Sequence, residues 1–85
     1  MLELVPAELA AEITAAVEIP TIGIGAGKDC DAQVLVWSDL MGLTAKPPKL
    51  AKAYRNLRTE MSNAVQEWSA DVASGAFPDE GQTFH

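Results

Sequence analysis

The chain has 85 residues, of which 48% are hydrophobic and 21% charged, so it is too short for two ordinary domains and too apolar for a disordered protein. Six Lys and Arg residues against twelve Asp and Glu give a net charge of −6, which argues against nucleic acid and anionic membranes as partners. The single cysteine, the lack of a secretory leader and the lack of an apolar span of ~20 residues indicate a reduced, cytoplasmic protein.

The first 25 residues predict a strand, a helix and a second strand. Residues 1–5 are apolar except at Glu3 and predict a strand. Pro6 favours the start of a helix over residues 7–18, and residues 21–25 predict the next strand. This order is typical of a parallel βαβ unit. Because a buried strand seldom begins at an initiator methionine, we expect further sequence before Met1.

The remaining residues predict one more strand and mostly helix. Residues 33–37 have strand character, and Ser38 or Asp39 could cap a short helical turn through residues 40–41. Apolar residues at spacings of three and four predict a long amphipathic helix over residues 49–74, with a core-facing stripe, that ends at Gly75. Residues 76–85 are expected to form an irregular tail. Trp37 and Trp68 are interpreted as packing residues.

Two motif-like stretches fail the tests for known ligand sites. In the glycine-rich residues 22–28, Lys28 replaces a glycine of the dinucleotide fingerprint, and Ile22 and Asp29 break the P-loop pattern. Asp29 and Asp31 resemble the start of a calcium loop, but its glycine and its final glutamate are absent. We therefore interpret these residues as a tight turn and a solvated acidic turn.

The isolated Cys30 and His85 are interpreted as a small, partly buried side chain and an exposed terminal side chain. Glu3 differs from both. A carboxylate within an apolar strand is costly to bury unless it has a partner or a task, so Glu3 is either exposed at a strand end or functional. In a β/α barrel it would lie near the carboxyl-end rim that holds the chemistry.

Four sequence blocks, in the right order, carry a family resemblance. They are residues 3–10 (ELVPAELA), 19–27 (IPTIGIGAG), 30–37 (CDAQVLVW) and 77–85. Together they resemble the C-terminal part of the ketopantoate hydroxymethyltransferase family, a family of (β/α)₈ barrels. The resemblance implies an α/β fold in which residues 1–85 form a single partial domain, the C-terminal fragment of the barrel. Strands seven and eight would be residues 1–5 and 21–25, followed by closing helices.

The resemblance also implies a reaction. In the family, magnesium-bound 3-methyl-2-oxobutanoate loses a proton, and the enolate takes a one-carbon unit from 5,10-methylenetetrahydrofolate to give 2-dehydropantoate for pantothenate biosynthesis. The family's proton acceptor corresponds to Glu3. Ile24, Val34 and Val36 match positions that line the substrate pocket, although they could equally be barrel core.

The family's magnesium ligands and its other oxoacid contacts lie on earlier strands, so no metal ligand is expected in this chain and we expect it to be inactive alone. The complete family enzyme is a homodecamer. This sequence departs from the family at Leu4, Ala32, Ser38 and 81–82. Two alternatives remain open. The chain could be a non-catalytic interaction module that docks through its long helix, or a half-barrel that becomes active with the missing strands.

Overall fold

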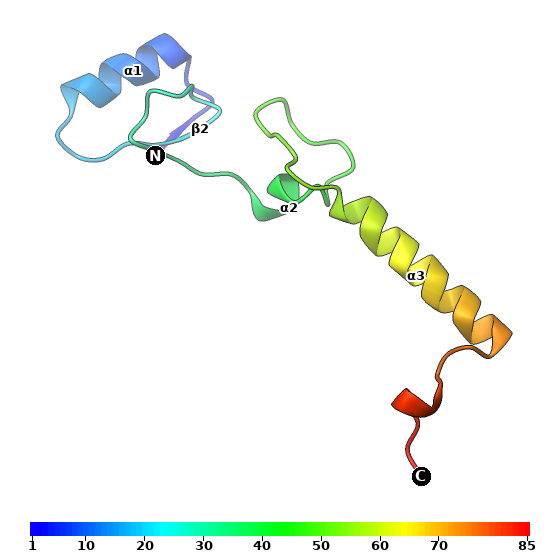
Figure 1. Ribbon diagram of the computed structural model, residues 1–85. Coiled ribbons are helices and arrows are strands. Elements are labelled where there is room, and N and C mark those ends of the chain that lie inside the picture. Colours follow the sequence, from blue (N-terminus) through cyan, green and yellow to red (C-terminus); the bar gives the residue numbers. More distant parts are fainter.

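The computed structural model describes residues 1–85, which form a small β/α unit followed by two helices and a short tail (Figure 1). The unit contains β1 (Leu2–Glu3), α1 (Ala7–Ala16), β2 (Ile22–Ile24) and β3 (Ala32–Gln33). The short α2 (Trp37–Leu40), the long α3 (Leu57–Ser74) and the 3₁₀ turn η1 (Glu80–Gln82) follow. The α/β class is therefore confirmed.

The three strands form one parallel sheet in the order β1-β2-β3. Leu2 pairs with Gly23 and Glu3 with Ile24, while Ile22 pairs with Ala32 and Gly23 with Gln33. Parallel neighbours joined through a helix are the arrangement that the βαβ pattern predicts. The strand–helix–strand prediction for the first 25 residues is thus confirmed, with shorter elements than the sequence suggested.

The first strand ends early because of its backbone. Leu4 adopts φ 55°, a left-handed conformation that a non-glycine residue rarely takes and that cannot continue a strand. Its N–H still donates to the carbonyl oxygen of Ile24 (3.0 Å), so it stays at the edge of the sheet. Only two residues of the predicted strand over residues 1–5 therefore form strand structure.

The strand predicted over residues 33–37 is wrong for most of its length. The N–H of Val34 donates to the Gly23 carbonyl oxygen (3.0 Å), and no ladder pairing follows it. The chain then leaves the sheet, and Trp37 becomes the first residue of α2. Val36 is the N-cap and makes no side-chain capping bond, so Ser38 and Asp39 lie inside the helix rather than capping it.

The long helix predicted over residues 49–74 begins only at Leu57. The amides of Tyr54, Leu57 and Arg58 donate to the carbonyl oxygens of Leu40, Met41 and Gly42, at 2.8, 3.1 and 3.1 Å. Residues 49–56 therefore fold around the end of α2 instead of extending α3. The carbonyl groups at the end of α2 and the amides at the start of α3 have no partners within their own helices, and these hydrogen bonds satisfy both sets. The predicted end is confirmed, because Gly75 adopts φ 84° as the C-cap.

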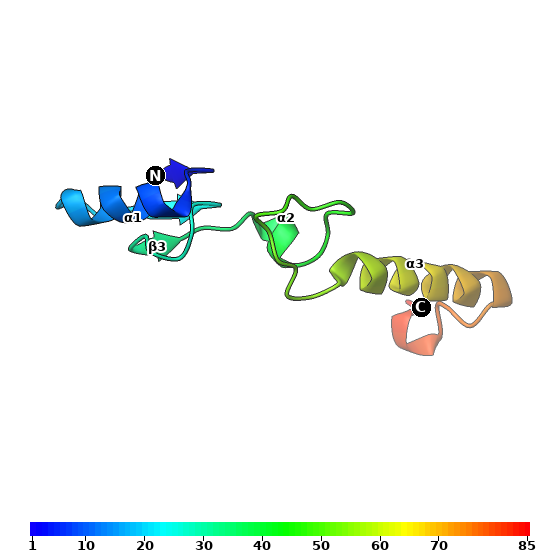
Figure 2. The ribbon, with the colours of Figure 1, turned by 90° about the horizontal axis from the view of Figure 1, so that it is seen from above.

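The apolar stripe of α3 faces solvent, so the prediction that it faces a core is wrong for this chain. No α3 residue is buried, and the exposed side chains include Met61, Val65, Trp68 and Val72. Both views show α3 directed away from the sheet (Figures 1 and 2). Trp37 is 65% exposed, and Trp68 makes only an edge-on contact with Phe77, at 6.3 Å between ring centroids.

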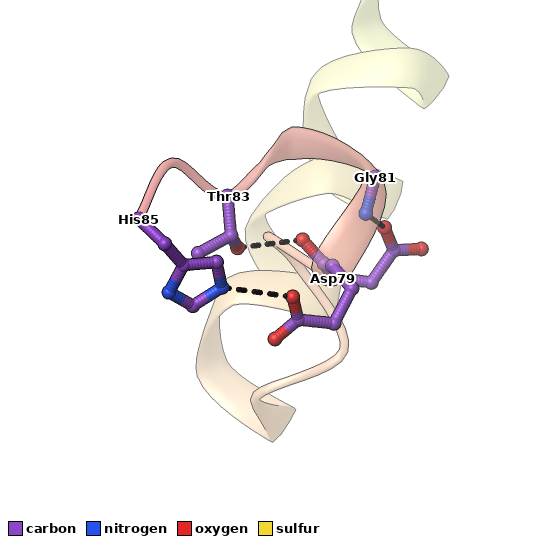
Figure 3. A network of polar contacts seen from close by, with 5 residues as sticks. Asp79, Gly81, Thr83 and His85 are labelled. Atoms are coloured by element: carbon purple, nitrogen blue, oxygen red, sulfur yellow. Dashed lines mark hydrogen bonds and ion pairs between the residues drawn. The ribbon is translucent and has the colours of Figure 1, made fainter.

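The C-terminal tail is held by a local network around Asp79 (Figure 3). The Asp79 carboxylate accepts from the Gly81 amide (2.7 Å), and the Gln82 side chain accepts from the Asp79 amide (2.9 Å). This is a reciprocal capping box that closes η1. His85 is exposed, as expected, and its Nε2 atom lies 3.0 Å from a Glu80 carboxylate oxygen, a hydrogen bond that is an ion pair when the imidazole is protonated. Gln82, a departure from the family pattern, is thus a working part of the turn.

Candidate functional site

Glu3 and Ile24 lie side by side at the carboxyl ends of two parallel strands. Their Cα atoms are register partners across β1 and β2, and residues paired in this way project from the same face of a sheet. Ile24 is 9% exposed and belongs to the small core, whereas the Glu3 side chain is exposed. The pairing gives one carboxylate beside one apolar side chain at the sheet end where β/α proteins concentrate their chemistry.

Val34 extends this row and Val36 does not. The bond from the Val34 amide to the Gly23 carbonyl places Val34 directly after β3, on the other side of β2 from Glu3. Val34 is 42% exposed and has room for a ligand contact. Val36 is the N-cap of α2, beyond the sheet. The structure therefore gathers Glu3, Ile24 and Val34, and leaves Val36 apart from them.

An open pocket of about 430 Å³ lies just beyond the ends of β1 and β2. Its walls come from the segment after β1, the glycine-rich segment after β2 and a later loop, and they comprise Leu4, Val5, Pro6, Ala7, Gly25, Gly27, Lys49 and Leu50. Glu3 is not among the lining residues but immediately precedes Leu4. The pocket therefore adjoins the carboxylate without containing it.

Gly25 allows the later loop to reach this pocket. It adopts φ 65°, and a Cβ atom added there would lie 2.8 Å from Leu4 Cδ2 and 3.2 Å from Leu50 Cβ. Both the conformation and the close approach require glycine. The glycine-rich stretch thus has the tight-packing role that the sequence indicated.

A hydrogen-bond network fixes the opposite ends of the strands. Asp31 accepts from the amide and the hydroxyl of Thr21, at 2.8 and 3.2 Å, and the Thr21 hydroxyl is 2.8 Å from that of Thr14 on α1. Thr21 is buried, so these bonds satisfy its polar groups away from water. Asp31 itself remains exposed, in agreement with its interpretation as part of a solvated turn. Its carboxylate joins the start of β2 to the turn before β3.

Comparison with known sequences decides the family. The sequence model described as "Ketopantoate hydroxymethyltransferase" matches residues 1–80. The chain belongs to the ketopantoate hydroxymethyltransferase family. The predicted resemblance is confirmed, and with it the assignment to a family of transferases.

Curated members of the family cover the chain almost completely. It is 60% identical over 85 residues to the 3-methyl-2-oxobutanoate hydroxymethyltransferase of Acidothermus cellulolyticus. The aligned region covers 99% of the chain and 31% of that protein. The enzyme of the same name from Streptomyces avermitilis is 56% identical, and the alignment covers 100% of the chain and 30% of that protein. The enzyme from Haloarcula marismortui is 51% identical, and the alignment covers 98% of the chain and 31% of that protein. The chain thus spans about 30% of the length of these relatives.

The residues of this ketopantoate hydroxymethyltransferase segment do not form a metal site. No group of three or more His, Cys, Asp or Glu side chains lies close enough together to hold an ion. The magnesium that the family resemblance implies does not fit the residues present here. Even α3, the longest helix, lacks the apolar length that a membrane crossing requires.

Sequence reasoning missed Leu4, Lys49 and Leu50 as residues of the pocket. Nothing in the local pattern around Leu4 signals a left-handed backbone. Lys49 and Leu50 were expected to begin a helix, and that expectation does not include the contact of Leu50 with Gly25. The signal that could have identified this loop is Pro47-Pro48 followed by regularly spaced lysines, a composition poorly suited to the start of a helix.

Proposed function

We propose that this chain is the C-terminal third of a 3-methyl-2-oxobutanoate hydroxymethyltransferase, with β1 and β2 as the last two strands of its (β/α)₈ barrel and Glu3 as the proton acceptor. The observation that carries the proposal is the register pair of Glu3 and Ile24 at the carboxyl ends of adjacent parallel strands. A base and an apolar contact then lie on the same face of the sheet.

The proposed chemistry begins at the branched carbon of 3-methyl-2-oxobutanoate. A carboxylate oxygen of Glu3 takes the proton from this carbon, and the electron pair of the broken C–H bond forms an enolate. Water adds to the methylene carbon of 5,10-methylenetetrahydrofolate and supplies the hydroxyl oxygen, and the two C–N bonds to this carbon break, so that formaldehyde and tetrahydrofolate separate. The enolate carbon then attacks the formaldehyde carbon to form the new C–C bond, and the resulting alkoxide takes up a proton to give 2-dehydropantoate. Ile24 and Val34 supply apolar contacts for the two methyl groups. Val36, displaced from the row, would act only after a rearrangement of residues 34–36.

The chain alone is proposed to be inactive. Magnesium would be held by residues outside this segment, because its own acidic side chains form no cluster. The outer edge of β1 is unpaired and would be completed by the preceding strand of the barrel, whereas the second edge of β2 is paired with β3. The working protein is then this segment joined to the rest of a cytoplasmic enzyme, which we propose forms a homo-oligomer when complete.

The test is proton exchange in the reconstituted protein. The chain is mixed with a separately expressed segment that supplies the missing strands, and hydrogen–deuterium exchange at the branched carbon of 3-methyl-2-oxobutanoate is followed by NMR with magnesium present. Glu3→Gln keeps the shape of the side chain and removes the base. We expect it to lower the exchange rate by a factor of about 10² to 10⁴, the usual contribution of a general base.

Glu8→Gln is the matched control for this test, because Glu8 is an exposed glutamate in the first turn of α1. It should leave the exchange rate within about twofold of the unsubstituted protein, as an exposed surface substitution does. An exchange rate that Glu3→Gln leaves unchanged would remove Glu3 from the mechanism.

The exposed stripe of α3 favours the second candidate function, a module that docks on a partner. The same variants separate the two candidates. A docking module would lose its function with a charge placed in the stripe, such as Val65→Lys, and would be indifferent to Glu3→Gln. The enzymatic proposal expects Glu3→Gln to lower the exchange rate by a factor of about 10² to 10⁴ while the reconstituted protein still assembles.

A further inference from the structure

The positive charges of this acidic chain are concentrated in one short segment. Five of the six Lys and Arg residues lie within residues 46–58, at intervals of three: Lys46, Lys49, Lys52, Arg55 and Arg58. The segment contains no Asp or Glu. The rest of the chain contains Lys28 and all twelve acidic residues. We call residues 46–58 the basic segment.

None of these five cations is neutralised within the chain. All five side chains are exposed, and the single ion pair of the structure joins His85 to Glu80, far from them in sequence. Lys52 lies over the Tyr54 ring with its Nζ atom 4.8 Å from the centroid, and Arg55 donates to the Tyr54 carbonyl oxygen at 2.7 Å. These contacts use π-electrons and a neutral acceptor and leave the charges uncompensated.

The basic segment also ends where positive charge is least favourable. Arg58 lies in the first turn of α3, beside the positive end of the helix dipole. The amides of Leu57, Arg58 and Thr59 already donate to Met41, Gly42 and Asn56, so the helix start offers no free N–H to an anion. An anion held through the side chains would relieve the repulsion among the cations and with the dipole.

The basic segment borders the candidate site. Lys49 and Leu50 line the pocket beyond β1 and β2, and the Leu50 side chain packs close to Gly25. A second pocket of about 390 Å³ is lined by Pro47, Tyr54 and Arg55 among others. Cations of the basic segment therefore lie at both pockets, Lys49 at the one that adjoins Glu3 and Arg55 at the other. A ligand that reacts at Glu3 and extends past Lys49 would enter the neighbourhood of the basic segment.

We propose that the basic segment binds the glutamate tail of the folate one-carbon donor, a polycarboxylate, and makes the protein prefer donors with several glutamates. The inference rests on the proposed function, which supplies the donor. A folate with one glutamate carries two carboxylates, and each further γ-linked glutamate adds one. A row of cations at regular intervals suits a chain of carboxylates better than the single carboxylate of the oxoacid.

The test measures how affinity depends on tail length. Tetrahydrofolate with one glutamate and with five is titrated by calorimetry into the full chain reconstituted with its complementary segment. We expect the pentaglutamate to bind at least about tenfold more tightly, because each exposed ion pair strengthens binding by a factor of about two to five. The advantage should shrink as salt rises from 50 to 200 mM, since salt screens exposed charges.

The triple variant Lys46→Gln, Lys49→Gln, Lys52→Gln should reduce the advantage to about twofold, because three of the pairs are then missing. Lys28→Gln is the matched control, since it removes the one cation outside the segment and should keep the tenfold preference. A free γ-linked pentaglutamate should compete with the tail. Equal competition by an α-linked glutamate peptide would instead identify a general site for acidic peptides and overturn the assignment to the donor.

The outcome of this binding test does not depend on the outcome of the Glu3 exchange test, so failure of the tail site can be told apart from failure of the proposed function. Oxoacid exchange requires no folate, so it reports on Glu3 alone. Equal affinity for the two folates, or a triple variant that keeps the full preference, overturns the tail site and leaves the role of Glu3 intact. Exchange that survives Glu3→Gln, together with a preference that depends on the basic segment, overturns the proposed base and leaves the tail site.

Discussion

Leu4 and Gly25 meet beside the candidate proton acceptor, and both have left-handed backbones, with φ 55° and φ 65°. For leucine this conformation costs about 1–2 kcal/mol, so the surrounding structure must hold it in place. The Leu4 amide bound to Ile24 and the packing of its side chain near Gly25 provide that support. Strained residues of this kind are frequent at functional sites, and here the strain directly follows Glu3.

We expect Gly25→Ala to destabilise the reconstituted protein by about 2–4 kcal/mol, because the new methyl group adds steric overlap with Leu4 and Leu50 to the backbone strain. Gly75→Ala is the matched control. Gly75 also has a positive φ, of 84°, but a Cβ atom there meets nothing within 4 Å. Its cost should be about 1–2 kcal/mol, from strain alone. Urea unfolding measures both, and equal losses would contradict the packing argument.

At the scale of elements, the start of α3 is set by contacts rather than by periodicity. Asn56 is the N-cap, and its side-chain oxygen accepts from the Thr59 amide at 3.4 Å. Because α3 buries no residue, capping and intrinsic propensity carry a larger part of its stability than in a packed helix. Its 18 residues are only a little longer than the ~12–15 at which isolated helices become marginally stable in water.

Asn56→Ala should therefore lower the helix content of the chain, with a loss of about 1 kcal/mol for the missing cap. Circular dichroism at 222 nm measures the change. Asn63→Ala makes the same substitution in the interior of α3, where alanine is the better helix former, and should keep or raise the signal. A larger loss from Asn63→Ala than from Asn56→Ala would show that α3 is not stabilised at this cap.

The elements that were predicted correctly are those with strong local signals. Pro6 marked the start of α1, and Gly75 marked the end of α3. The apolar spacing continued back through Leu50 and Tyr54, so periodicity alone extended α3 eight residues too far. The amides that fold residues 49–56 around α2 are contacts with distant parts of the chain, which a local pattern does not contain.

The candidate site was predictable in part for the same reason. The order strand, helix, strand implied that Glu3 and the segment around Ile24 would be neighbours, and the register confirms that they are. Whether they act as base and substrate contact stays a prediction. The basic segment was visible in the sequence but was hidden when the charge was averaged over the whole chain. Its place beside the pocket needed the contact between Leu50 and Gly25.

At the scale of the whole molecule, the chain is extended. Its radius of gyration is 21.5 Å, whereas a compact chain of this length has one of about 12 Å. Three buried apolar residues, Ala10, Ile24 and Ala26, form its core, and many large apolar side chains remain exposed. Such a surface is typical of a piece that packs against other protein. The chain on its own should therefore associate with itself.

We expect sedimentation to give a mass that rises with concentration, because the apolar stripe of α3 is exposed along the helix. Val65→Lys places a charge in the stripe and should shift the onset of association to at least about tenfold higher concentration, since burying an unpaired lysine is costly. Gln66→Lys adds the same charge at a neighbouring α3 position that points away from the stripe, and should have little effect. Equal shifts would indicate a general charge effect.

The three hydrogen bonds that the amides of Tyr54, Leu57 and Arg58 donate to the end of α2 have a mechanical consequence. They couple the direction of the long helix to that of the short one, so the pair turns as a single arm. An arm formed by 18 helical residues is about 27 Å long, and a tilt of about 10° at its base moves its tip by about 5 Å. The pivot is the extended stretch 34–36, which also carries Val34 and Val36, two of the three residues predicted to line the substrate pocket. A ligand that binds those valines and fixes the conformation of residues 34–36 would thereby fix the direction of α3.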